Sequence, residues 1–147
     1  MEERSGFMVE RMLIMKHFES KSVTLSRPAD VIYDKFSDFN NFRGLIPDER
    51  IEKFECTETS CTISAKGIPD FTLDIMEKIP WRRIVYNTHG QKPLDIRFGF
   101  DIKSLDVNST EIKIFIDADV NGLTGTMLSR PFQNLIDMMA DNLEKMM

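Results

Sequence analysis

The sequence predicts an α+β fold in which a curved antiparallel sheet of about seven strands wraps around one long C-terminal helix, with two short helices after the first strand. Two observations carry this prediction. Apolar and polar residues alternate through most of the stretch from 50 to 120, which is typical of strands with one covered and one wet face. Residues 124–146 instead carry apolar side chains at steps of three and four, which indicates an amphipathic helix.

The first elements follow from a change of period near Pro28. Residues 16–26 alternate small polar with apolar side chains and predict the first strand. Pro28 suits the first turn of a helix, and Asp30 suits the positive end of its dipole. Residues 37–44 predict a second short helix, which Gly44 would terminate.

Six further strands are expected at 50–56, 61–66, 70–79, 82–89, 94–105 and 110–120. In the clearest of them, Phe98 and Phe100 share one face, whereas Arg97 and Asp101 share the other. Turn-forming residues separate the strands, as Asn-Gly does after the last. The strand carboxylates fall on the polar face, so we expect them to be solvated and not paired for acid–base chemistry.

Composition excludes several classes of function. The 147 residues fit one domain, 15–147, preceded by an extension, 1–14, that is either helical or frayed. Met15 is an alternative start to Met1. A net charge of −5 argues against nucleic-acid binding and against docking on an anionic membrane. No apolar run approaches the ~20 residues of a membrane span, and no signal peptide is recognisable, so we expect a cytoplasmic location.

The sequence contains no recognisable catalytic or metal-binding motif. There is no nucleophile elbow, zinc-protease helix or phosphate loop, so we expect no cofactor, no metal and no catalytic residue. His17 and His89 are isolated. Cys56 and Cys61 flank four residues that would form a hairpin loop. They are either a redox-labile disulfide or two small buried thiols, and a reducing compartment favours the thiols.

Four segments resemble the START-like superfamily, also called SRPBCC, over about residues 16–147. They are FESKSV at 18–23, RPADVIYD at 27–34, SDFNNF at 37–42 and the helix at 127–147. The superfamily includes lipid-transfer START domains, the birch-pollen-allergen family, polyketide cyclases and co-chaperone activator domains. The resemblance implies the helix-grip fold with a cavity between the sheet and the C-terminal helix. It also implies a lipid, sterol-like or polyketide-like apolar molecule as partner.

The candidate cavity residues are those that the strand alternation and the helix stripe turn inward. They are Phe71, Leu73, Tyr86, Thr88, Phe98, Phe100, Ile114, Ile116, Leu128, Phe132, Leu135 and Met139. Methionines near the C-terminus suit an adaptable apolar lining, but plain core packing explains them as well and is the favoured interpretation.

Three functions remain open. The first is binding or carriage of a small hydrophobic molecule without catalysis. The second is a cyclase- or dehydratase-type enzyme, which needs an ionisable group inside the cavity; Tyr86 and His89 are its first suspects. The third is a co-chaperone-like interaction module, which needs an exposed apolar patch. The extension 1–14 could supply such a patch or mediate a homodimer.

Overall fold

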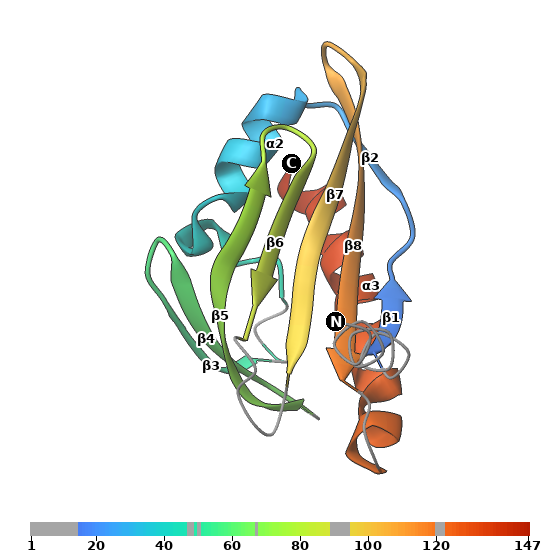
Figure 1. Cartoon of the computed structure of the whole chain (residues 1–147). Helices are drawn as coiled ribbons and strands as arrows, with labels where there is room; N and C mark the ends of the chain where they lie inside the picture. Colours follow the sequence, from blue (N-terminus) through green and yellow to red (C-terminus); the bar gives the residue numbers. More distant parts are fainter. Residues whose placement is uncertain (1–14, 47–48, 50, 67, 89–94, 120–122) are drawn as a thin grey trace, which may run out of the picture.

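The computed structural model describes residues 15–46, 49, 51–66, 68–88, 95–119 and 123–147. The extension 1–14 and His89 therefore lie outside the described residues. In chain order the elements are β1 (Met15–Glu19), β2 (Val23–Leu25), α2 (Ala29–Phe36), the 3₁₀ helix η1 (Phe39–Phe42), β3 (Ile51–Cys56), β4 (Ser60–Ala65), β5 (Ile68–Ile79), β6 (Arg83–Asn87), β7 (Ile96–Asp106), β8 (Ser109–Asp119) and α3 (Leu123–Met146). Figure 1 shows these elements along the chain.

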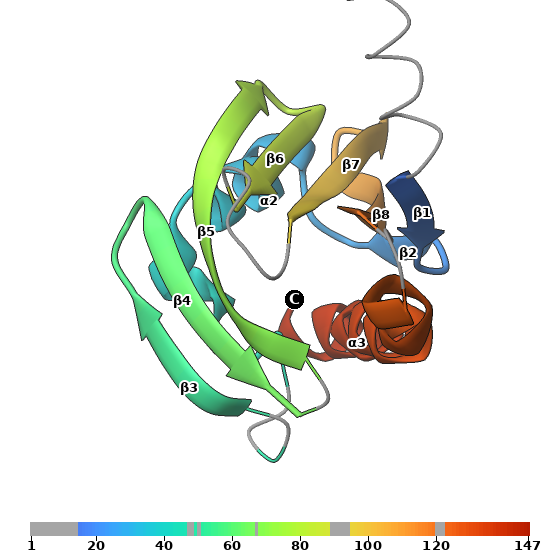
Figure 2. The same cartoon turned by 60° about the horizontal axis from the view of Figure 1, so that its bottom comes forward.

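The strands form one antiparallel sheet in the order β1-β8-β7-β6-β5-β4-β3, with β2 also pairing with β8. Strands β3 to β8 are sequential neighbours, so they form a meander, and the first strand closes against the last. The sheet curves around α3, as Figure 2 shows. The predicted fold class is therefore confirmed. Within the described part of the chain, no helix is both long and apolar enough to cross a bilayer.

The predicted first strand, 16–26, is in fact two strands, which raises the number in the sheet to eight. The cause is Ser20, whose N–H donates to the Ile114 carbonyl at 2.8 Å and whose Oγ accepts from the Ile114 N–H at 3.0 Å. A side chain thus replaces a backbone partner at this point, and β1 ends. Pairing with β8 resumes at Val23.

Register shifts bend the far half of the sheet. They lie between Ile51 and Lys53, between Ile63 and Ala65, and between Ile75 and Glu77. Such bulges increase the local twist and bend of a strand. They therefore let β3, β4 and β5 curve towards α3.

The concave face is covered by two helical groups, whereas the sequence pattern predicts the terminal helix alone. Helix α3 packs mainly against β8 and β2, and α2 packs against β6 and β7. Phe36 of α2 stacks on Phe100 of β7 with ring centroids 4.7 Å apart. Phe42 of η1 contacts Tyr86 edge-on at 5.3 Å. These rings form an aromatic cluster that fills the part of the concave face near α2.

Among the described residues, the convex face carries one buried aromatic residue, Phe115. Its ring lies under the Arg83 guanidinium, 4.8 Å from the ring centroid, and stacks on His17 at 6.1 Å. On the neighbouring strand it covers Gly99, where an added Cβ would lie 2.6 Å from the Phe115 ring and 2.6 Å from the Ile84 carbonyl oxygen. Gly99 is thus required because the ring occupies the space of a side chain.

Candidate functional site

A small cavity lies between the sheet and α3. Its free volume is about 20 Å³, counted as the space open to the centre of a water molecule. The lining comes from η1 and the turn after it, from β4, β5, β7 and β8, and from α3. The lining residues are Phe42, Ile46, Ile63, Phe71, Leu73, Ile96, Phe98, Ile116, Phe132, Leu135 and Met139.

The chemistry of this lining is uniform. Each of the eleven residues has an apolar side chain, so the cavity offers dispersion contacts and no proton donor or acceptor from these side chains. A volume of 20 Å³ holds about one water molecule. A larger guest therefore needs the walls to move.

Seven of the twelve candidate residues line this cavity. They are Phe71, Leu73, Phe98, Ile116, Phe132, Leu135 and Met139. Tyr86, Phe100 and Ile114 are buried in the core around it. Thr88 is also buried, and its Oγ1 accepts from the Ile96 N–H at 3.0 Å. The side chain of Leu128 lies outside the described part of the chain. Contact of any of these residues with a ligand stays a prediction.

Four lining residues were missed by the sequence analysis: Phe42, Ile46, Ile63 and Ile96. Two of them carried a usable signal, because Ile63 lies in a predicted strand and Ile96 shares its alternation with Phe98. The sequence around Phe42 and Ile46 gave no signal that they would line a cavity. They reach the cavity because the chain after α2 folds back under the sheet, and local periodicity does not report that path.

Solved structures with the same architecture are numerous and distant in sequence. A START superfamily protein from Mycobacterium smegmatis has a TM-score of 0.68 at 15% identity, covering 88% of this chain and 95% of that one. The chain has a START-like helix-grip fold. Norcoclaurine synthase from Thalictrum flavum shares this START-like fold with a TM-score of 0.69 at 12% identity, over 90% and 94% of the two chains. An aromatase/cyclase from Streptomyces sp. R1128 scores 0.60 at 18% identity, over 90% and 96%.

Sequence comparison adds no finer grouping to the START-like fold. No family model matches the sequence, and no curated protein sequence matches it either. At these levels of identity the structural likeness establishes the fold alone.

Tyr86 has a structural role in the START-like fold. Its hydroxyl donates to the Phe36 carbonyl, which ties β6 to the end of α2. Burial raises the pKa of Tyr86 well above its ordinary value of 10.0, so the phenol stays neutral. A neutral, hydrogen-bonded phenol outside the cavity lining does not suit the proton-transfer role that the enzyme hypothesis gives it.

His17 lies on the convex face, away from the cavity. Its two ring nitrogens lie 2.5 Å from Asp117 Oδ1 and 2.8 Å from Glu19 Oε1, and Lys113 Nζ lies 3.5 Å from Glu19 Oε2. Partial burial lowers the pKa of His17, but the hydrogen bonds and charges of Glu19 and Asp117 raise it more. The net pKa is above the ordinary 6.5. No group of three or more potential ligands in the described residues is arranged to hold a metal.

This cluster predicts a pH dependence of stability. Because the folded-state pKa is raised, protonated His17 contributes its full stabilisation below the unfolded pKa of about 6.5, and this is lost as the pH rises through the folded value. We expect wild type to exceed His17→Gln in Tm by more at about pH 5.5 than at about pH 8.5. The side chain is half-exposed, so salt should shrink the difference. Thermal unfolding of both proteins at both pH values checks this, and an equal gap would contradict it.

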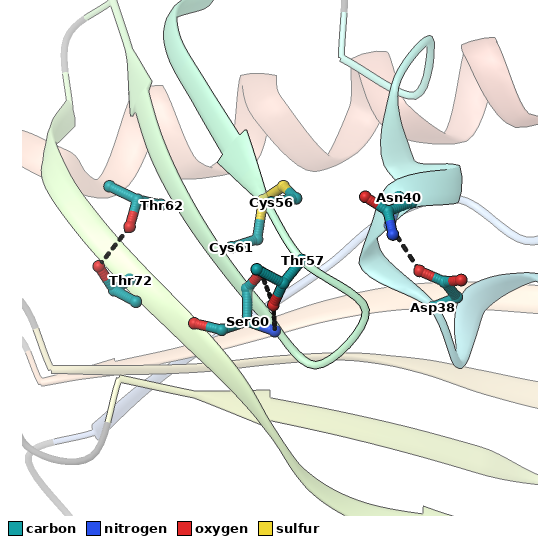
Figure 3. The surroundings of a disulfide bond; sticks show 8 residues. All are labelled: Asp38, Asn40, Cys56, Thr57, Ser60, Cys61, Thr62 and Thr72. Carbon is teal, nitrogen blue, oxygen red and sulfur yellow. Dashed lines mark hydrogen bonds between the residues drawn. A yellow bond between two sulfur atoms is a disulfide. The ribbon is translucent and has the colours of Figure 1, made fainter.

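The structure joins Cys56 to Cys61 as a disulfide, which is one of the two alternatives that the sequence left open and not the pair of thiols that a reducing compartment favours. The two residues are register partners in β3 and β4, and the hairpin places them face to face. Cys61 is buried, but Cys56 is only partly buried. Figure 3 shows the bond beside η1.

A second, open groove lies where the β5–β6 turn, the β7–β8 turn and the start of α2 meet. Its volume is about 620 Å³. Trp81, which has a positive φ of 65°, and Val107 line it and are 59% and 83% exposed. An exposed apolar group is what the interaction-module hypothesis requires, and that hypothesis stays a prediction. Since Trp81 is the one tryptophan of the chain and does not line the inner cavity, its fluorescence is a poor reporter of cavity binding.

Proposed function

We propose that the protein binds a small apolar molecule between the sheet and α3 and holds it without changing it chemically. The observation that carries the proposal is the uniformly apolar lining at the junction of sheet and helix. A guest there gains from leaving water and needs no oriented polar partner. The cyclase or dehydratase alternative requires an ionisable group facing the guest, and none of the eleven lining side chains is ionisable.

Binding requires the cavity to open, and the polar contacts of α3 indicate how. Gln133 Nε2 donates to the Glu19 carbonyl at 2.9 Å, and Lys21 Nζ lies 2.6 Å from Asp141 Oδ1. Both contacts tie α3 to β1 and the chain directly after it. On another side of the helix, Asn142, which directly follows Asp141, donates from Nδ2 to the Leu45 carbonyl at 2.9 Å. The helix is therefore expected to pivot about the β1 side, with Asn142 acting as the latch.

The lining also indicates which chemical class of ligand would bind best. Four of the eleven residues are phenylalanines, and Met139 adds a flexible, polarizable side chain. Phenyl rings pack well on the faces and edges of other rings. Among lipid, sterol-like and polyketide-like partners, this lining favours a flat ring system. The likeness to an aromatase/cyclase fits that choice but does not by itself identify a ligand.

A neutral dye tests the proposal. N-phenyl-1-naphthylamine should bind wild type saturably, and Met139→Phe, which fills the remaining free space, should weaken binding by about tenfold. Met76→Phe is the matched control, because Met76 is an exposed residue and does not line the cavity. Its affinity for the dye should stay within about twofold of wild type.

The dye-binding experiment has three informative results. Displacement of the dye by flat polycyclic competitors, with Met139→Phe weakened and Met76→Phe unchanged, would support the proposal. Dye fluorescence that rises linearly without saturation in wild type would contradict it. Equal weakening in both variants would also contradict it, because the dye would then sit outside the cavity.

A further inference from the structure

The Cys56–Cys61 bond joins two cysteines of unequal accessibility. Cys56 ends β3 and is partly exposed, whereas Cys61 lies in β4 and is 1% exposed. Their Cα atoms are 4.0 Å apart, as directly opposed residues of an antiparallel pair. The turn between them is closed without the bond, because the Thr57 N–H donates to the Ser60 carbonyl at 2.8 Å. The two sulfurs are therefore expected to stay adjacent when the bond is reduced.

We propose that Cys56 and Cys61 form a reversible thiol–disulfide exchange site whose co-reactants are low-molecular-weight thiols and disulfides. Cys56 is the less buried residue of the pair, so a small molecule is expected to reach its sulfur first. The buried Cys61 sulfur reacts only with its neighbour across the hairpin. Unequal access of this kind separates the attacking thiol from the resolving thiol.

The chemistry balances without a further reagent. The Cys56 thiolate attacks one sulfur of a small disulfide RSSR, which forms a Cys56–SR mixed disulfide and releases RS⁻. The Cys61 thiolate then attacks the Cys56 sulfur, which forms the Cys56–Cys61 bond and releases a second RS⁻. The two protons of the protein thiols pass to the two released thiolates. In the reverse direction, two small thiols reduce the bond and leave as RSSR.

The redox state of Cys56 and Cys61 is linked to the wall of the cavity through the loop between them. The Glu58 carbonyl in the loop accepts from the Phe39 N–H at 3.0 Å, and the Thr59 carbonyl accepts from the Ile75 N–H at 3.4 Å. Phe39 begins η1, and Phe42 at its other end lines the cavity. Figure 3 shows Asp38, the N-cap of η1, and Asn40 of η1 beside the hairpin. The bond adds a covalent restraint to a loop that a backbone hydrogen bond already closes, so its reduction leaves the hairpin paired but lets the anchor of η1 fluctuate more.

The exchange reaction is tested on the full chain in glutathione buffers of graded thiol-to-disulfide ratio, quenched with iodoacetamide and weighed intact. We expect the alkylated fraction to fall as the disulfide share rises, with no mixed disulfide persisting in wild type. A protein that stays fully reduced, or fully oxidised, at every ratio would overturn the proposal.

Two single variants test the unequal roles. Cys61→Ser should accumulate a lasting glutathione adduct on Cys56, because the resolving sulfur is gone. Cys56→Ser should take up the adduct at least about tenfold more slowly, because Cys61 is buried. Equal rates in the two variants would show that access does not distinguish the sulfurs and would remove the assignment of roles.

The effect on η1 is tested by amide hydrogen exchange, which needs no ligand. Reduction should speed exchange about fivefold in the peptide 37–45 and leave 97–103 of β7 unchanged. Equal exchange in the two redox states would overturn the link to η1. Only the further consequence, faster dye entry into the reduced protein, rests on the proposed function. Failure of dye binding would therefore leave the mass and exchange results standing.

Discussion

Replacing Phe42 with alanine is expected to lower the free energy of unfolding by about 4 kcal/mol, because it removes the centre of the aromatic cluster. Phe42 is buried, and its ring contacts those of Phe36, Phe39, Tyr86, Phe98 and Phe100 at centroid distances from 4.9 to 6.3 Å. For a chain of this size the loss corresponds to a fall in Tm of about 12 °C. Urea unfolding measures the free energy directly.

Phe54 supplies a matched control for this change. It is only partly buried at the edge strand β3, where Arg43 lies over its ring at 5.5 Å. Phe54→Ala should cost about 1 kcal/mol. The cavity opened by Phe42→Ala adjoins the existing one, so millimolar benzene should raise the Tm of Phe42→Ala by more than that of wild type. Equal losses for the two alanine variants would contradict the central position of Phe42.

Replacing Gly99 with alanine should cost about 3 kcal/mol, although it adds a single carbon. The new Cβ would lie 2.6 Å from a backbone oxygen, that of Ile84, and 2.6 Å from the Phe115 ring. The ring is itself confined by His17 and Arg83, so it cannot swing away freely. A fall in Tm of about 9 °C follows, measured by circular dichroism.

Two comparisons isolate the clash at Gly99. Arg97→Ala, at an exposed outward position on the same strand, should change stability by under about 0.5 kcal/mol. The double variant Gly99→Ala/Phe115→Ala should cost less than the sum of the two single costs, because one of the two obstacles to the new Cβ is gone. A double variant whose cost is the plain sum of the two single costs would show that the ring does not confine position 99.

Periodicity predicts the meander well because each of its strands has one face on the core. Phe98, Phe100 and Ile102 alternate in sequence and are buried in the structure. The division of the first strand was not predictable by the same means. It depends on Ser20 bonding to Ile114, 94 residues further along the chain, and a serine in an alternating run gives no sign of that.

In the candidate site too, residues on regular elements were predictable from periodicity, whereas residues placed by long-range packing were not. Residues on regular elements, such as Leu73 and Met139, reach the lining because a strand face or a helix stripe has a fixed direction. Phe42 and Ile46 reach the lining because α2 and η1 lie under the sheet. That position is set by tertiary packing, which the local sequence pattern does not report. The small size of the cavity was equally inaccessible, since residue volumes do not set the distance at which α3 packs.

The pairing of β1 with β8 also sets the order in which the strands of the sheet can pair during synthesis. Phe18 is the register partner of Ile116, so the first strand has no neighbour until β8 has been synthesised. During synthesis, the meander from β3 to β8 can assemble as each hairpin leaves the ribosome, but β1 and β2 must wait, and α3 arrives last. Closure of the sheet and burial of its concave face therefore wait until β8 and α3 have been made, and a chain cut before β8 would leave the N-terminal strands exposed to wrong partners.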